Sequence, residues 1–187
     1  MKNKHLYLFF LTLVLTSLAC SIFVGGPDYP ANPVPFSMEA VDSFDQQVQQ
    51  AMAIGAETGV FTLQINEVQI TSYLTLKMQQ KVNPPFTDPQ VLLRDNQMQI
   101  FGKVQRGYFL ANMAIIMSVG IDEAGLPRIE VVSADFGPFP APQGLNEAIS
   151  AIVGEAFTGS IGPAAIGMRL EAISIADGVM TLTGQIK

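Results

Sequence analysis

The sequence has almost none of the side chains on which nucleophilic and metal-dependent catalysis most often rely. It contains one histidine, one cysteine and no tryptophan. His5 and Cys20 both lie within the first 20 residues, so residues 21–187 have neither. For that part of the chain this excludes Ser–His and Cys–His catalysis, zinc sites built on His or Cys, and haem bound through them. We therefore expect no enzymatic activity, no cofactor and no metal ion.

Charged side chains are also sparse, at 14% of the residues, whereas 49% are apolar. Without residues 1–19, eight basic side chains face sixteen acidic ones, which gives a formal charge of −8. The basic residues are scattered and form no stripe. Because an acidic chain repels phosphate backbones, we expect no nucleic-acid partner.

Residues 1–19 have the three zones of a secretory signal. Two lysines precede an apolar run over residues 6–18, and small residues lead to Cys20. A cysteine directly after a small residue resembles a bacterial lipobox, although Ser17 stands where most lipoboxes carry leucine. The resemblance implies cleavage before Cys20 and a diacylglyceryl group on its thiol, so that Cys20 is the lipid-attachment residue of a lipoprotein.

Two alternatives to lipid attachment remain open. Ordinary cleavage would release a secreted protein. Without cleavage, the 19 residues from 6 to 24 come close to the about 20 needed to cross a bilayer. In all three cases the rest of the chain faces away from the cytoplasm. We expect it in the cell envelope, anchored to a membrane on the extracytoplasmic side.

Residues 20–36 follow as the lipidated cysteine and a tether rich in proline and glycine, which suits neither a helix nor a central strand. An extended tether at about 3.1 Å per residue would lift the domain by roughly 50 Å. The alternative is a loop that packs on the domain. Residues 37–187 have the size of a single domain and can form no internal disulfide.

Periodicity predicts the elements of this domain. Ser37 is expected to cap a helix with an apolar stripe formed by Met38, Val41, Phe44, Val48 and Met52, and Asn66 to cap a second helix with Ile70, Tyr73, Leu74 and Met78 on its apolar face. Strands are predicted over residues 59–65, 91–94, 98–105, 108–121, 128–136, 168–175 and 179–186. A third helix is predicted over residues 145–156. The short turns between the middle strands predict an antiparallel meander.

The strand over residues 108–121 is apolar on both faces, and an antiparallel strand with one solvated face should not be. Something apolar is therefore expected to cover part of both sides. Methionines on this strand and its neighbours suit a surface that adapts to several shapes. We predict an apolar groove for a lipid, although a filled core is the alternative. The candidate groove residues are Met98, Ile100, Met113, Ile115, Met117, Val119, Ile149, Ile152, Val153, Met180 and Leu182.

The layout of residues 61–186 resembles bacterial envelope proteins with a tubular lipid-binding (TULIP-like) half-domain, including the YpmS-type and LmeA-type families. The similar segments are residues 62–66 leading into a helix that opens at Glu67, residues 91–95 followed by 98–100, residues 137–140 before a helix from Gly144, and residues 173–183 with their turn at 177–178. The resemblance implies a curved sheet around a long helix, with an apolar groove for acyl chains. It implies lipid binding or transport and supplies no catalytic residues.

These observations predict an α+β fold in which a long antiparallel meander curves around a long helix in the C-terminal half, with one or two N-terminal helices. The predicted function is that of a non-enzymatic, membrane-anchored lipoprotein that binds a lipid or other apolar ligand. The alternative is a structural lipoprotein that binds an envelope protein.

Overall fold

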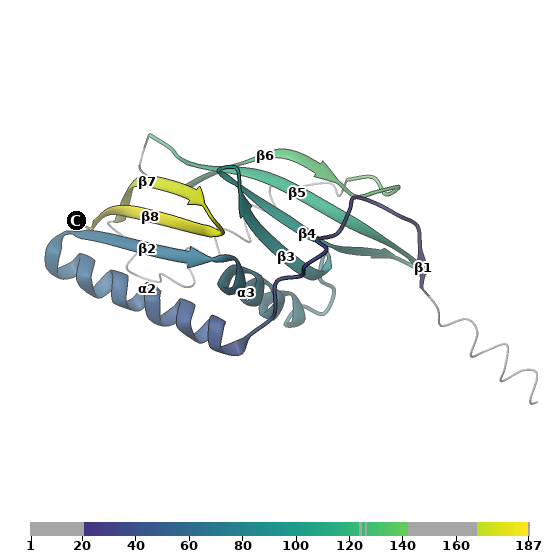
Figure 1. Ribbon diagram of the computed structural model, residues 1–187, viewed down its shortest axis with the longest axis horizontal. Helices are drawn as coiled ribbons and strands as arrows, with labels where there is room; N and C mark the ends of the chain where they lie inside the picture. The colour runs from purple at the N-terminus through teal and green to yellow at the C-terminus, as the bar shows by residue number, and fades with distance from the viewer. Residues whose placement is uncertain (1–20, 124, 126, 142–167, 187) are drawn as a thin grey trace, which may run out of the picture.

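Eight strands and two helices make up the part of the chain that the computed structural model describes, residues 21–123, 125, 127–141 and 168–186 (Figure 1). In chain order the elements are β1 (Ile22–Phe23), α2 (Met38–Thr58), β2 (Val60–Asn66), α3 (Glu67–Gln79), β3 (Thr87–Arg94), β4 (Gln97–Arg106), β5 (Phe109–Ile121), β6 (Pro127–Asp135), β7 (Met168–Ala176) and β8 (Val179–Ile186). The large sheet has the order β1-β5-β4-β3, with β6 also paired to β5, and the small sheet has the order β2-β8-β7.

Helix α2 begins and ends where the capping residues predict. The Ser37 hydroxyl accepts a hydrogen bond from the Ala40 amide, and Gly59 closes the helix in the left-handed region at φ 79°. The predicted apolar stripe is wrong at its first residue, because Met38 is 50% exposed, whereas Met52 is partly buried and packs against the hydrophobic cluster. Ala51 and Gly55 are buried instead, since the helix lies close against β2 and only small residues fit there.

Helix α3 begins with a capping box in which Asn66 and Gln69 exchange hydrogen bonds, at 2.9 and 3.0 Å. Its buried face is more polar than predicted, because Gln69, Thr71 and Ser72 are all buried. Each has a partner outside the helix: the Thr71 hydroxyl, for example, accepts a hydrogen bond from the amide of Val91 on β3 at 3.0 Å. Helix α3 thus satisfies polar groups of the sheet edge as well as burying apolar side chains.

The meander from β3 to β6 is antiparallel throughout. Asp95 and Asn96 both have positive φ, as a two-residue turn of this hand requires, and they bring Arg94 opposite Gln97. Asp177 and Gly178 make the equivalent turn between β7 and β8. The conformation of each turn depends on the residues within it, so both turns could be predicted from the sequence.

The small sheet joins segments that are distant in the sequence. β2 pairs with β8 along its whole length, from Val60 opposite Gln185 to Asn66 opposite Val179. Strand β7, at the other edge, contacts β3 and β5 of the large sheet. The core of the described part therefore lies between two sheets, with α2 packed against β2 and α3 against β3 (Figure 1).

The predicted fold class is wrong. Of the described residues, 47% lie in strands and 25% in helices, so this is a mostly β structure with a curled sheet. Both described helices precede the meander, and the described C-terminal half contains strands only. The apolar face of the meander is covered by a second sheet and by α3, which supply the burial that a long helix was expected to supply. The helix predicted over residues 145–156 lies outside the described residues.

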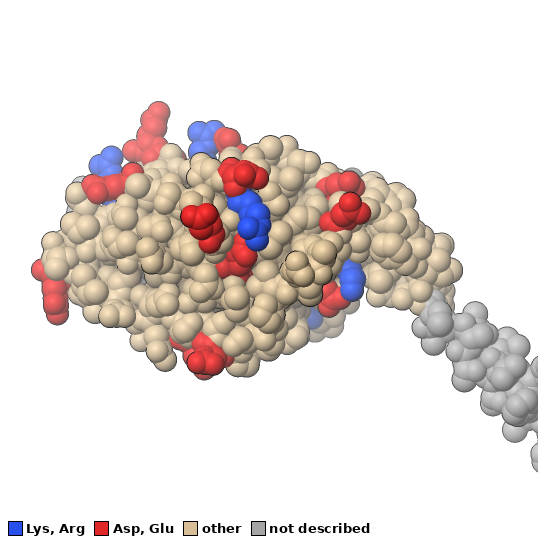
Figure 2. All heavy atoms as spheres, viewed as in Figure 1, with Lys and Arg blue, Asp and Glu red and all other residues tan. Residues whose placement is uncertain are grey.

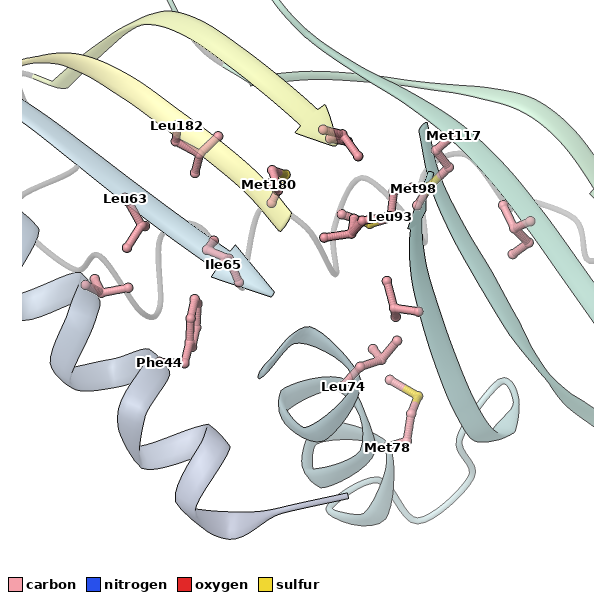
Figure 3. Packing of buried hydrophobic residues seen from close by; sticks show 14 of the residues in the cluster. Phe44, Leu63, Ile65, Leu74, Met78, Leu93, Met98, Met117, Met180 and Leu182 are labelled. Carbon is pink, nitrogen blue, oxygen red and sulfur yellow. The ribbon is translucent and has the colours of Figure 1, made fainter. Parts of the chain in front are cut away.

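One hydrophobic cluster spans both sheets and both helices. Phe44 from α2, Leu63 and Ile65 from β2, Leu74 from α3 and Leu93 from β3 all belong to it (Figure 3). Neither described helix is both long enough and apolar enough to span a membrane.

The segment that was predicted to be a tether is bound to the large sheet. Strand β1 pairs in parallel with the start of β5, and the Asn112 amide donates to the Gly25 carbonyl at 2.9 Å. We call residues 24–36 the strap, because they continue from this edge toward β3 and α3 (Figure 1). There the Val34 amide donates to the side chain of Gln90, and the Ser37 amide donates to the Ser72 hydroxyl at 3.0 Å.

The strap therefore does not lift the domain by roughly 50 Å, and of the two alternatives the packed loop is the one observed. Its prolines exclude a helix, but its remaining amides and side chains still find partners on the sheet. The Asn112 side chain, on the face of β5 opposite the core, donates to the Pro27 carbonyl at 3.1 Å. The strap thus contacts the face of β5 opposite the core through a polar group, whereas the cover predicted for this face was apolar.

Tyr29 makes the strap sensitive to alkaline pH. Its hydroxyl donates to the backbone carbonyl of Asp88 at 2.6 Å, and burial, with the nearby negative charge of Asp88, raises the pKa of Tyr29 to about 12. The unfolded chain loses this proton near the ordinary tyrosine pKa of about 10. The stability that the neutral hydroxyl contributes is therefore fully present below pH ~10 and is lost as the pH rises toward 12.

We expect the ultraviolet titration of tyrosine in the folded protein to contain a component near pH 12 that is missing in Tyr29→Phe. Tyr108→Phe is the control, because Tyr108 is exposed and distant from the strap's contact with β3, and it should keep that component. The same high-pH component in Tyr29→Phe would contradict the assignment.

Candidate functional site

The core face of β5 carries the candidate groove residues of that strand. Met113, Ile115 and Met117 point into the hydrophobic cluster and are almost fully buried, and Val119 is partly buried beside them. On β4, Met98 is buried and Ile100 partly buried, and their registers place them opposite Met117 and Ile115. The structure thus brings these six residues of the large sheet together.

Two further candidates, Met180 and Leu182, lie on β8 of the small sheet and are buried in the same cluster. Figure 3 shows Met180 projecting from β8 toward the side chains of Leu93, Met98 and Met117 on the large sheet, with Leu182 farther along β8 near Leu63. We call this meeting of side chains the seam, defined by Leu93, Met98, Met117 and Met180. Ile149, Ile152 and Val153, the other candidates, lie outside the described residues.

The seam contains three methionines, Met98, Met117 and Met180. Met78 and Met113 are buried in the same cluster, so five of the described methionines belong to it. An unbranched thioether fills irregular gaps and changes rotamer at low cost. The seam can therefore repack around different shapes more readily than one made of β-branched residues.

Few backbone hydrogen bonds cross the seam, because its two sides belong to different sheets. Those within the described part are at its ends: the Gly178 amide donates to the Leu93 carbonyl at 3.3 Å, and the Leu170 amide donates to the Gly125 carbonyl at 2.8 Å. The Ile175 amide also donates to the Asn96 side chain at 3.3 Å, near the first of these ends, and packing of apolar side chains joins the two sheets between the ends.

Glu67 forms hydrogen bonds with both sheets at one end of the seam. Its carboxylate accepts a hydrogen bond from the Leu93 amide at 2.8 Å and lies 3.4 Å from the Arg94 guanidinium. Its own amide donates to the Gly178 carbonyl in the turn of the small sheet at 3.2 Å. One residue thus links α3 to both sheets. Sequence reasoning identified Glu67 only as a helix opener, because its partners are 26 and more residues away along the chain.

A cleft of about 390 Å³ lies between α2 and β2, lined by polar side chains and by the apolar Ile54 and Leu63. Sequence reasoning missed it, since the cleft depends on how α2 packs against β2. Gln47 and Gln50 line it from the helix, and Gln64 from the strand. These carboxamides donate and accept hydrogen bonds but carry no charge, so the cleft suits a neutral polar ligand or a peptide backbone.

Charged side chains in the described part gather at no catalytic or metal-binding cluster. Within residues 21–141 and 168–186, apart from the two undescribed positions, no three His, Cys, Asp or Glu side chains are grouped to hold a metal ion. Acidic side chains are spread over the face in Figure 2, and Lys103 pairs with Asp88 at 2.8 Å. An exposed pair of this kind contributes about 0–1 kcal/mol.

Comparison of the chain with protein-family models, with curated proteins and with solved structures finds no match.

Proposed function

We propose that this protein is a membrane-anchored extracytoplasmic lipoprotein, without enzymatic activity, that binds the acyl chain of a lipid at the seam between its two sheets. The observation that carries the proposal is the set of methionines that meet there from both sheets, Met98 and Met117 on one side and Met180 on the other. The resemblance to tubular lipid-binding half-domains, which implies an acyl ligand, is part of the same proposal.

The energetics of the seam support this ligand class. Opening the seam breaks mainly dispersion contacts, because in the described part the backbone hydrogen bonds that cross it lie at its ends. An acyl chain placed between the sheets replaces those contacts with others of the same kind, so little polar free energy is lost. The flexible methionine side chains can then adapt to the ligand.

Anchoring at Cys20 would place the seam close to a membrane, which contains the acyl chains that it is proposed to bind. Cys20 lies two residues before the start of β1, and pairing of β1 with β5 binds Ile22 and Phe23 to the large sheet. A diacylglyceryl group on Cys20 would therefore hold the domain directly at the membrane surface, where acyl chains are available.

The test uses the chain from Ser21 onward, which lacks the attachment residue. We expect it to take up a fluorescent fatty acid, and organic extraction followed by mass spectrometry to recover co-purified lipid. The triple variant Met98→Leu, Met117→Leu, Met180→Leu conserves core volume but stiffens the seam, so its affinity should be about ten-fold weaker, or ~1.4 kcal/mol. The double variant Met38→Leu, Met52→Leu on α2 is the matched control and should bind as the original chain does. If no lipid co-purifies and no fluorescent fatty acid is taken up, the proposal is wrong.

A second candidate function, binding of an envelope protein as a scaffold, is favoured by one observation. The cleft between α2 and β2 combines uncharged carboxamides, which suit a peptide backbone, with apolar side chains, which suit the side chains of a peptide. A photo-reactive side chain at Gln50, inside this cleft, should capture a protein in whole cells if the scaffold function holds. The same group at Val132, which is exposed on β6 outside the cleft, should capture none.

A further inference from the structure

The far end of the large sheet exposes four large apolar side chains next to one another. Ile22, Phe23, Tyr108 and Phe109 are 55%, 57%, 64% and 48% exposed. Pairing of β1 with β5 places Ile22 opposite Phe109 and Phe23 opposite Leu110, and the Ile22 amide donates to the Tyr108 carbonyl at 2.6 Å. We call these four residues the tip. They come from two segments more than 80 residues apart, so only the fold makes them a patch.

The tip is apolar where a hairpin turn in water is normally polar. Gly107, with φ 60°, makes the turn between β4 and β5, and two aromatic residues follow it directly. Since neighbouring residues on a strand point to opposite faces, Phe109 and Ile22 extend one face of the sheet, and Phe23 extends the other. The sheet therefore ends in a wedge that is apolar on both sides. Aromatic residues, Tyr in particular, favour the boundary between water and lipid.

Charge at the tip fits a phospholipid surface. The two segments that form it, residues 21–24 and 105–110, contain no acidic residue although the chain as a whole is acidic. The register of β4 and β5 places Arg106 opposite Phe109, where a guanidinium can reach a lipid phosphate. Figure 2 shows this end of the molecule largely free of acidic side chains on the face in view.

The position of Cys20 relative to β1 indicates that the tip contacts a phospholipid bilayer. Cys20 precedes Ile22 by two residues, so their Cα atoms lie within about 7 Å of each other. The pairing of β1 removes any slack, because the Val24 amide also donates to the Leu110 carbonyl at 2.8 Å. Any anchor at or before Cys20 therefore brings a bilayer to the tip, and a lipid on Cys20 brings it within one or two residues.

We propose that the tip, formed by Ile22, Phe23, Tyr108 and Phe109, inserts into the interfacial layer of the phospholipid bilayer that holds the anchor and thereby fixes how the domain stands on the membrane. This inference rests on the membrane anchoring in the proposed function and does not depend on lipid binding at the seam. A domain held at two adjacent points, the anchor and the tip, has a defined orientation, whereas a domain on a free tether has none.

The chain contains no tryptophan, so a single introduced tryptophan is the only one that emits. The full chain, carrying its lipid, is reconstituted into vesicles of phosphatidylcholine and phosphatidylglycerol with or without brominated acyl chains. Insertion to about 5–10 Å should roughly halve the emission of Phe109→Trp in brominated vesicles. Val60→Trp is the control, because it is similarly exposed at the opposite end of the molecule, and its emission should not change (Figure 1).

Flotation separates the two proposals. If the protein floats with the vesicles but Phe109→Trp is quenched no more than Val60→Trp, the proposed membrane anchoring is retained and the tip proposal is overturned. If the protein fails to float, the membrane anchoring is overturned and the tip proposal with it. Blue-shifted, unquenched emission that depends on protein concentration would show a second copy on the tip and would also overturn it. Tyr108→Trp provides a second reporter at the most exposed position should Phe109→Trp not fold.

Discussion

Replacement of Phe61 by alanine is expected to lower the free energy of unfolding by about 3–5 kcal/mol, the usual cost of truncating a buried phenylalanine. Phe61 is 1% exposed and is one of the largest fully buried side chains in the described part. A Cβ added at Gly55 on α2 would lie 3.1 Å from Phe61, and one at Gly184 on β8 would lie 2.8 Å from its ring. The ring thus fills the space between helix and sheet that these two glycines leave open.

The matched control for Phe61 is the residue before it. Val60 points to the other face of β2 and is 49% exposed, so Val60→Ala should change the free energy of unfolding by less than about 1 kcal/mol. Urea denaturation followed by circular dichroism measures both variants. A loss in Phe61→Ala no larger than that in Val60→Ala would show that the interface between α2 and the small sheet collapses to refill the cavity.

Replacement of Cys20 by serine is expected to abolish incorporation of labelled fatty acid into the protein in a bacterial host that processes lipoproteins. A thioether to diacylglycerol requires the thiol, and Cys20 is the only cysteine in the chain. The intact mass of the original protein should equal that of the chain from residue 20 plus its lipid. Ser21→Ala, next to the attachment residue, should incorporate label as the original chain does.

The same measurements distinguish the other two N-terminal alternatives. Ordinary cleavage predicts a shortened chain without lipid. An uncleaved anchor predicts an intact amino terminus, again without lipid. An unlabelled original chain would therefore remove the lipoprotein assignment, and its mass would identify the alternative that replaces it.

The candidate site was only partly predictable from the sequence. Alternation along residues 108–121 identified Met113, Ile115 and Met117 as one face, and β5 has that face buried. Alternation could not show that Met180 approaches them from a second sheet. It also missed Glu67, whose contacts with Leu93 and Gly178 depend on the packing of α3 between the two sheets.

The sequence by itself determined those features that depend on a few consecutive residues. The Ser37 and Asn66 caps, the turn at Asp95 and Asn96, and the antiparallel strands on either side of it follow from local hydrogen bonds, from φ preferences and from period-two burial. These forces act over three or four residues, so they can be recognised in the sequence without knowledge of the fold.

Only the tertiary structure decided which surfaces meet. It paired β2 with β8 from the other end of the domain, bound the proline-rich strap to the large sheet, and brought Ile22 beside Phe109 at the tip. The physical reason is that hydrophobic burial is non-directional: an apolar face must be covered, but its pattern does not say whether a helix, a strap or a second sheet covers it. Here a second sheet covers the core face of the meander, and pairing of β1 with β5 places Ile22 and Phe23 at the end of the large sheet.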